Sequence, residues 1–515
     1  MNRSYFISSI FFIFLLSLFI FQQINLTTAD LGRHIMNGKV LINAESFNIS
    51  RDTLLHTNFF SYTHPDFPFV NHHWGSGILL YFIFSIFGFA GLSLFYGGLI
   101  ILASLILFNL WRNKLPLFVS FPIVLFLIPL IAERTEIRPE GISYLFLAII
   151  VFLLYRYARS ELREKWLWFI PVISLLFANT HIYFIFVPFI IGMFLLETLI
   201  RKDFLKSKTL ATVLGVTILA ICINPYGFYG VIYPFIVFKN YGYLVAENQS
   251  IPFLINYGIH NPNFLWWTLS SLLLIIGGIF TFRKSKGEFP IALFITSVTF
   301  GILAFLGIRH LTLYGLILIP IFLNYAYILY NQTLEPKKLE TRITASIFIS
   351  LFIFISILIN FNSVLPWRAN WGVGLMSEVN ASADFFKKEN MQGPIFSNYD
   401  IGGYLIFHLY PKEKVFIDNR PEGYPVSFFK DEYVPIQDED SVWNTELKKW
   451  NFNAIYFYRH DLTPWAQKFM IARISDPAWA PVFVDNYTIV FLQRNEQNAE
   501  LIKKYELPKS LFSVQ

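Results

Sequence analysis

Long apolar runs fill most of the first 362 residues of this 515-residue chain and limit its fold more than any other feature. A helix of roughly 20 apolar residues can cross the hydrocarbon core of a bilayer. Only 14% of the residues are charged, whereas soluble proteins carry about 25%. The sequence therefore predicts a polytopic α-helical membrane protein of about 11 spans. The expected spans lie near residues 4–22, 90–110, 115–131, 141–155, 166–178, 181–199, 209–223, 264–281, 290–306, 310–329 and 341–362.

Basic residues predict which loops are cytoplasmic, because Lys and Arg accumulate on that side of the membrane. The basic segments are "WRNK" (111–114), "RYARSELREK" (156–165), "RKDFLKSK" (201–208), "FRKSKGE" (282–288) and "EPKKLETR" (335–342). Their alternation predicts a multi-pass protein of the cell inner (cytoplasmic) membrane with a cytoplasmic N-terminus and an extracytoplasmic C-terminus. A crossing at the apolar segment 75–88 would break this alternation. We therefore expect that segment to lie at the outer interface or to dip into the membrane.

Charged residues return after Trp371, where the chain changes character. Segments such as "KVFIDNR" are typical of strands, and "DSVWNTELKKWN" is typical of a helix. "VDNYTIV" predicts a hairpin with Asp485-Asn486 as its turn. Gly402-Gly403 could begin a helix that cradles an anion. We expect a transmembrane domain over residues 1–365, with a first outer loop at 23–89, and an extracytoplasmic α/β domain over 366–515.

Asp30 follows the first apolar run directly and is the first candidate for chemistry. A carboxylate just outside a span can act as a general base or help to hold a divalent cation. It can equally be the N-cap of a short helix. Arg33 and His34 follow within one turn, and they can position a phosphate or face lipid headgroups.

The same loop carries a group of imidazoles that includes His72 and His73, with Asp66 nearby in sequence. Clustered imidazoles beside carboxylates can bind a metal, but their spacing matches no common chelating motif. Aromatic, amide and imidazole groups also suit sugar recognition or an interfacial belt. The single cysteine, Cys222, excludes an intrachain disulfide and a Cys-based metal site.

Other outer loops are unusually polar. "AERTEIRPEGIS" (132–143) places alternating acids and arginines between two spans, and charges there are costly and often functional. An arginine can bind a phosphate through two hydrogen bonds, although the charges can also pair with one another. "FANTHIYF" and "LGIRHL" add further candidates at short outer turns. The candidates in these loops are Glu133, Arg134, Glu136, Arg138, His181, Arg309 and His310.

Together these residues place acids, cations and aromatics on one membrane face. An anionic, lipid-linked substrate would reach them from the bilayer. A carboxylate base could activate an acceptor hydroxyl for displacement at a sugar carbon. Cations would then stabilise the departing phosphate.

"TADLGRHIMNG", followed by "TNFFSYTHPDFPFVNHHWGSGILLYFIFSIFGFAGL", resembles the first outer loop of GT-C glycosyltransferases. The likeness is to the bacterial branch related to protein mannosyltransferases and lipid A aminoarabinose transferases. "EIRPEGISYLFLAII", "ANTHIYF", "NPYG" and "IRHL" resemble recurrent segments of such proteins, and the likeness covers about residues 1–330. The resemblance implies that Asp30 is catalytic and that residues 75–88 form a juxtamembrane helix.

Many members of this superfamily have two adjacent acids after the first span, whereas Leu31 follows Asp30 here. The candidates for a second acid are therefore Glu133, Glu136 and Asp66. This departure also leaves open whether a divalent cation such as Mg²⁺ or Mn²⁺ takes part.

The expected function is an inverting transfer of a hexosyl or pentosyl group from a polyprenyl-phosphate donor to an extracytoplasmic lipid, glycan or protein acceptor. The expected partners are these substrates and membrane lipids, with no nucleic acid. The residues expected to bind the donor phosphate or substrate are Arg33, His34, His72, His73, Arg134, Arg138, His181, Arg309 and His310. One alternative is a transporter or flippase, which should carry charges near mid-span and repeated halves. Another is a non-catalytic membrane assembly protein.

Overall fold

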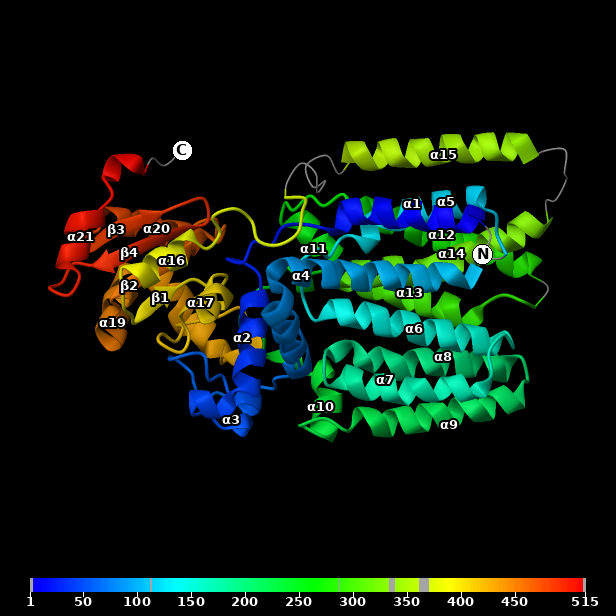
Figure 1. Cartoon of the computed structure of the whole chain (residues 1–515), viewed down its shortest axis with the longest axis horizontal. Helices are drawn as coiled ribbons and strands as arrows, with labels where there is room; N and C mark the ends of the chain where they lie inside the picture. Colours follow the sequence, from blue (N-terminus) through cyan, green and yellow to red (C-terminus); the bar gives the residue numbers. More distant parts are fainter. Residues whose placement is uncertain (1–2, 112–113, 286, 333–338, 361–369, 513–515) are drawn as a thin grey trace. The chain divides into compact units, whose positions relative to one another are not determined.

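A computed structural model describes residues 3–111, 114–285, 287–332, 339–360 and 370–512 (Figure 1). Contacts between residues divide the chain into two compact units. The helical unit comprises Met1–Gln23, Ser93–Val231 and Val245–Val373. The α/β unit comprises Ile24–Leu92, Ile232–Leu244 and Gly374–Gln515. Each unit is therefore assembled from segments that lie far apart in the sequence.

The helical unit is built from apolar helices. They are α1 (Arg3–Ile20), the second part of α4 (Trp74–Phe108), α5 (Leu117–Ile131), α6 (Glu140–Ala158), α7 (Phe169–Ala178), α8 (Phe186–Ile200), α9 (Phe204–Ile221), α10 (Phe228–Ile232), α11 (Ile251–Asn256), α12 (Asn263–Lys284), α13 (Ile291–Leu306), α14 (Leu311–Gln332) and α15 (Leu339–Asn360). Among the described residues, seven helices are long and apolar enough to cross a membrane, and α5 and α13 are shorter apolar helices. The chain is a multi-pass membrane protein, and the number of spans and their direction stay predictions.

Helix α14 is the centre of the helical unit. In its most apolar stretch 89% of the residues are buried, against 6% for α15. Helix α14 packs against α5 and α13. A Cβ atom at Gly315 would lie 2.9 Å from Leu130 Cβ and 3.0 Å from Ile131 N. Glycine therefore permits the close approach of α14 and α5 that small residues provide between membrane helices.

Helix α4 contains a break at Gly88, whose φ of 62° and ψ of −162° are not helical. Glycine adopts this conformation without a steric penalty. The break falls between the interfacial helix expected at residues 75–88 and the span expected at 90–110. Whether residues 75–88 cross the membrane stays a prediction.

The α/β unit contains a four-stranded sheet of order β1-β2-β4-β3. Strands β1 (Ile395–Ser397) and β2 (Ala454–Tyr458) are parallel, whereas β4 (Thr488–Gln493) is antiparallel to β2 and β3 (Trp479–Val484). The main helices of this unit are α2 (Leu31–Ile42), α3 (Arg51–His56), the first part of α4, α16 (Ala381–Lys388), α17 (Gly402–Leu409), α18 (Val434–Asp438), α19 (Asp440–Trp450), α20 (Pro464–Ser475) and α21 (Ala499–Tyr505).

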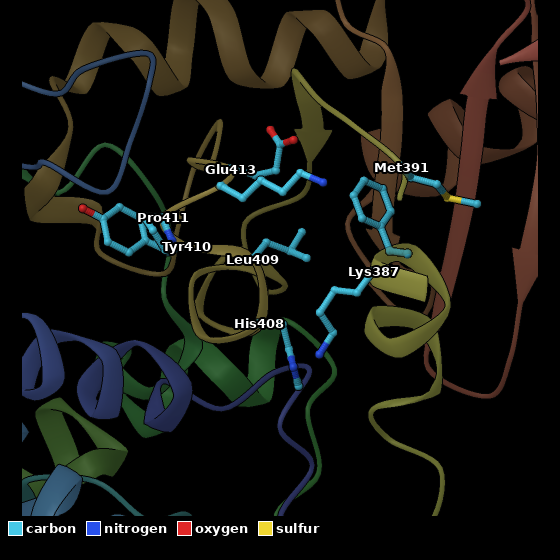
Figure 2. Close-up of a pocket in the computed structure, with 9 residues that line it drawn as sticks. Lys387, Met391, His408, Leu409, Tyr410, Pro411 and Glu413 are labelled. Atoms are coloured by element: carbon cyan, nitrogen blue, oxygen red, sulfur yellow. The ribbon is translucent and has the colours of Figure 1, made fainter. Parts of the chain in front are cut away.

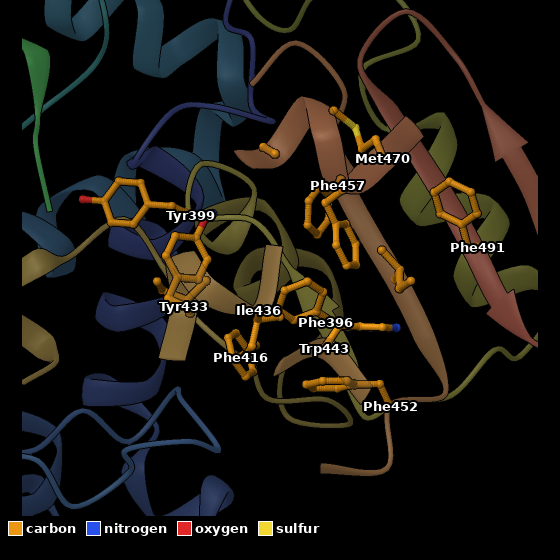
Figure 3. Packing of buried hydrophobic residues seen from close by; sticks show 14 of the residues in the cluster. Phe396, Tyr399, Phe416, Tyr433, Ile436, Trp443, Phe452, Phe457, Met470 and Phe491 are labelled. Carbon is orange, nitrogen blue, oxygen red and sulfur yellow. Dashed lines mark hydrogen bonds between the residues drawn. The ribbon is translucent and has the colours of Figure 1, made fainter. Parts of the chain in front are cut away.

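Aromatic side chains form the core of the α/β unit (Figure 3). The ring of Trp443 stacks on that of Phe452, with centroids 5.6 Å apart and planes 10° apart. Phe396 packs against both. Burying each such side chain stabilises the fold by roughly 1.5–3 kcal/mol. The core includes Phe416 and Ile417, which directly precede the turn at residues 418–423.

Candidate active site

Asp30 lies immediately before α2, in the α/β unit. Its backbone carbonyl accepts a hydrogen bond from the His34 amide at 3.1 Å. Asp30 occupies the N-cap position of α2, but its side chain makes no capping hydrogen bond to the helix. The side chain is partly exposed, while Ala29 and Leu31 on either side are buried. The chain thus presents the Asp30 carboxylate between two anchoring residues.

Arg33 lies one turn beyond Asp30, and it is only 6% exposed. Its Nε donates a hydrogen bond to Asn419 Oδ1 at 3.3 Å, and its Nη2 lies 3.4 Å from His34 Nε2. Burial lowers the pKa of Arg33, and the negative charge of Asp30 opposes that shift. The cation and the candidate base are therefore electrostatic neighbours.

The turn that supplies Asn419 is held by a buried ion pair. Both carboxylate oxygens of Asp418 accept hydrogen bonds from Arg420, at 2.7 and 2.6 Å. Arg420 also donates to Asn58 Oδ1 at 2.5 Å, and the Asn58 amide donates to Gly423 O at 2.8 Å. Asp418 is fully buried and Arg420 is 3% exposed. The turn 418–423 is thus anchored to the first outer loop from both ends.

Three of the histidines predicted to bind substrate, His34, His72 and His73, lie together in the α/β unit. The rings of His34 and His73 lie 5.2 Å apart edge to face, and those of His72 and His73 lie 3.8 Å apart. Tyr233 packs on His72 at 5.5 Å. Asp66, by contrast, is exposed. Imidazoles beside an aromatic ring suit the binding of a sugar or a phosphate.

The predicted arginines of the helical unit form a second charged cluster. Arg134 donates to Glu247 at 2.7 Å and to Glu140 at 3.2 Å. Arg138 donates to both carboxylate oxygens of Glu247 at 2.9 Å, and Arg309 donates to Glu140 at 2.9 Å. Three guanidinium groups thus face two carboxylates, and the side chains of Glu140 and Glu247 are only 2% and 17% exposed. We call these five residues the arginine cluster.

Electrostatics keeps the arginine cluster ionised. Burial alone would raise the pKa of Glu247, but Arg134 and Arg138 outweigh burial and lower the pKa to about 2. Burial likewise opposes the positive charge of Arg134, yet Glu140 and Glu247 raise its pKa well above the ordinary value. The carboxylates and guanidinium groups therefore stay charged together at neutral pH.

The two predicted acids of loop 132–143 have different environments. Glu133 accepts hydrogen bonds from Asn261, at 2.7 Å, and from Asn263. Burial raises the pKa of Glu133, and the amides of Asn263 and Asn261 offset part of the rise. Glu136 is 52% exposed and pairs with Arg138 at 2.8 Å. Their service as a second catalytic acid stays a prediction.

His181 and His310 both pack against Tyr183. The Tyr183 ring is 4.4 Å from His181 and 5.3 Å from His310. His181 is 1% exposed, and its Nδ1 lies 2.8 Å from Ser143 Oγ. Arg309 also donates to Asn248 Oδ1 at 2.9 Å. These contacts tie three short outer turns of the helical unit to the arginine cluster.

Glu140 and Glu247 were not among the candidates from the sequence, although they organise the arginine cluster. Glu140 begins α6, and Glu247 lies in the short helix η7 (Ala246–Asn248). The signal for Glu140 was its place among alternating charges. Glu247 carried no local signal, because its partners are more than 100 residues away in the sequence.

The acids of the arginine cluster do not fit a metal site. A hard divalent cation takes oxygen ligands, but these carboxylates accept hydrogen bonds from guanidinium groups. Across the described ranges, no group of three or more His, Cys, Asp and Glu side chains is arranged to hold an ion. The participation of a divalent cation such as Mg²⁺ or Mn²⁺ stays a prediction.

A separate pocket of about 380 Å³ opens in the α/β unit beside α16 and the end of α17 (Figure 2). Its apolar lining includes Phe386 and Leu409, and Lys387 contributes charge. His408 also lines it and lies 3.1 Å, Nε2 to Oδ1, from Asn380. Burial, followed by the charge of Lys387, lowers the pKa of His408 to about 4. The described lining contains none of the residues predicted from the sequence.

Comparison with family models and with curated protein sequences finds no match. Two solved structures are similar over 94% of this chain, at 12% sequence identity. One is the archaeal oligosaccharyltransferase AglB from Archaeoglobus fulgidus in complex with an inhibitory peptide and a dolichol-phosphate, with a TM-score of 0.60 over 74% of that chain. The other is the Archaeoglobus fulgidus oligosaccharyltransferase in complex with Zn and sulfate, with a TM-score of 0.55 over 73% of that chain. The chain therefore shares the fold of these two oligosaccharyltransferases, in agreement with the resemblance of its first outer loop to GT-C glycosyltransferases.

Proposed function

We propose that the protein is a membrane glycosyltransferase that moves a sugar from a polyprenyl-phosphate-linked donor to an extracytoplasmic acceptor. The observation that carries this proposal is the fold. It resembles, over 94% of the chain, an oligosaccharyltransferase whose structure includes a dolichol-phosphate. A fold alone does not define an activity, so the proposal also relies on the chemistry of the charged residues.

In the proposed reaction, Asp30 is the general base. It removes the proton from an acceptor hydroxyl while that oxygen attacks the anomeric carbon of the donor sugar. The bond from that carbon to the phosphate oxygen breaks, and the electron pair leaves with the lipid phosphate. Attack from the side opposite the phosphate inverts the anomeric configuration. Its partial exposure gives Asp30 access to such an acceptor.

The leaving phosphate gains negative charge and needs cations. The arginine cluster of the helical unit has the charge that phosphate binding requires, because three guanidinium groups face only two carboxylates and stay charged. The side chain of Glu136 is the most exposed part of this network, at 52%. We propose that a donor phosphate replaces Glu136 on Arg138. His34 and the two histidines beside it, His72 and His73, are proposed to contact the substrate.

The position of the charges favours an enzyme over a transporter. Transporters are expected to carry charged residues near mid-span. Here Glu140 begins α6, and Arg309 lies in η8 (Ile308–His310) at the start of α14. The buried charges therefore gather at helix ends.

The test is transfer or hydrolysis by purified protein with a panel of polyprenyl-phosphate-linked sugars and candidate lipid, glycan and peptide acceptors. General-base catalysis contributes roughly 10²–10⁴-fold, so Asp30→Asn should lower the rate by at least about 100-fold. Asp52→Asn is a matched control, because Asp52 lies in the same loop with 87% of its side chain exposed. Equal turnover by wild type and Asp30→Asn would remove Asp30 from the mechanism. Transport of a donor analogue without turnover would favour the flippase alternative.

A further inference from the structure

The backbone of α2 touches that of α17. A Cβ atom at Gly32 would lie 2.8 Å from Gly403 O, and one at Gly403 would lie 3.2 Å from Ala29 O. No side chain fits between the two helix starts. Ala29 and Gly32 flank Asp30, so this contact fixes the backbone from which the Asp30 carboxylate projects. Helices α2 and α17 lie side by side (Figure 1).

A hydrogen bond close to this backbone contact holds Arg33, the charged residue one helical turn after Asp30. Arg33 is three residues after Asp30, so the two side chains share a helix face. The guanidinium is held by Asn419. Asn419 lies in the segment 414–420, which was expected to be a strand but forms only an isolated β-bridge between Val415 and Ser61. Asn419 is also close to the helix contact, because a Cβ atom at Gly403 would lie 3.4 Å from its amide nitrogen.

The charges around Arg33 also belong to the C-terminal segment. Besides Asp30, the groups that act electrostatically on Arg33 are Arg420, Asp418 and Glu422. Asp418 and Arg420 neutralise each other in their bidentate pair. The carboxylates of Asp30, on one element, and Glu422, on the other, therefore both favour the charged form of Arg33. The side-chain contacts of Arg33 are the hydrogen bond to Asn419 and the approach of its Nη2 to His34 Nε2 at 3.4 Å.

We propose that Asn419 is a positioning residue that acts through Arg33 to orient Asp30 for sugar transfer. The inference rests on the proposed function of Asp30. It gives the C-terminal segment a part in the reaction, beyond that of an appended module. The hydrogen bond from Arg33 Nε to Asn419 Oδ1 positions the guanidinium. The close backbone contact between α2 and α17 at Gly32 and Gly403 holds the two elements together.

The test is a double-mutant cycle on purified full-length protein. Misplacement of a catalytic group by about 1 Å can cost about 100-fold in rate, so Asn419→Ala should lower kcat by about 10- to 100-fold without changing the KM for the donor. Arg33→Gln should lower it similarly. In the double variant, the second substitution should change kcat by less than about twofold, because both act through one contact. Independent, multiplicative losses would overturn the proposal, as would an unchanged kcat in Asn419→Ala.

Two further variants separate positioning from folding. Arg33→Lys retains the charge but lacks the Nε–H group, so it should reproduce the loss of Asn419→Ala; wild-type kcat in Arg33→Lys would contradict the proposal. Asn486→Ala is the matched control, because Asn486 is an exposed turn residue of the same unit, and it should retain wild-type kcat. The His34 amide should exchange its hydrogen faster in Asn419→Ala than in wild type. This measurement does not depend on catalytic activity. If Asp30→Asn is inactive while Asn419→Ala has wild-type kcat and exchange, only this inference fails; if Asp30→Asn remains active, the proposed function fails first.

Discussion

Glu247 offers the sharpest test of the arginine cluster, because one carboxylate holds two arginines. Its pKa is about 2 in the folded protein against an ordinary 4.5. Each unit corresponds to 1.36 kcal/mol, so the ionised form stabilises the fold by about 3 kcal/mol at pH 7. Because the folded pKa is depressed, this stabilisation is present above pH 4.5 and is lost as the pH falls toward 2. Glu247→Gln should remove about 3 kcal/mol at pH 7.

The assay is a denaturant titration in mixed micelles, followed by circular dichroism, at several pH values between 7 and 3. The difference between wild type and Glu247→Gln should shrink steadily below pH 4.5. Glu136→Gln is the matched control, because its ion pair is 52% exposed on the acid side and should contribute less than about 1 kcal/mol. A difference that stays constant from pH 7 to 3 would refute the ionic account. So would Glu247→Gln unfolding like Glu136→Gln at pH 7.

Two other perturbations address the α/β unit. Gly38→Ala should destabilise the protein by about 1–3 kcal/mol, because its Cβ atom would lie 2.0 Å from the Gly77 carbonyl oxygen. Gly98→Ala, in the helical unit, has open space around its Cβ atom and is the control for the glycine-to-alanine change itself. Equal melting temperatures of the two variants would contradict the expectation. His408 has a pKa of about 4 against an ordinary 6.5, so the unit should lose stability as the pH falls from 6.5 toward 4. His408→Gln should melt with less pH dependence over that range, and identical profiles would count against a neutral buried imidazole.

The sequence predicted features that depend on composition or on neighbouring residues. The resemblance to membrane glycosyltransferases, expected from the first outer loop, is confirmed at the level of the fold. The hairpin between β3 and β4 is also confirmed, but its turn lies one residue later than expected. The Asp485 amide donates to Thr488 O at 3.1 Å, so Asn486 and Tyr487 are the turn residues. Asp485 Oδ1 accepts hydrogen bonds from the amides of Tyr487 and Thr488, both at 2.7 Å. Such a turn is specified within five residues, so a local pattern is sufficient to find it.

Contacts between residues far apart in the sequence could not be predicted from local sequence patterns. The sequence singled out Arg134 and Arg138 correctly as unusual but gave no reason to join them to Glu247. Gly402 and Gly403 suggested an anion cradle, yet a Cβ atom at Gly402 would lie 2.4 Å from Asp418 Cα. The glycines are required by close packing of α17 on neighbouring backbone. Composition alone does not distinguish these two uses of glycine.

The discontinuous assembly of the α/β unit sets the order in which the protein can mature. The helix that begins after Asp30 emerges early from the ribosome, but its partner residues Gly403 and Asn419 follow only after some 370 further residues, most of them belonging to the helical unit. Chains generally fold from the N-terminus during synthesis, yet this helix must wait for the end of translation to complete its packing. Asp30 is consequently among the last groups to gain its final surroundings. A truncated or nicked chain would insert its helices and still lack an ordered base.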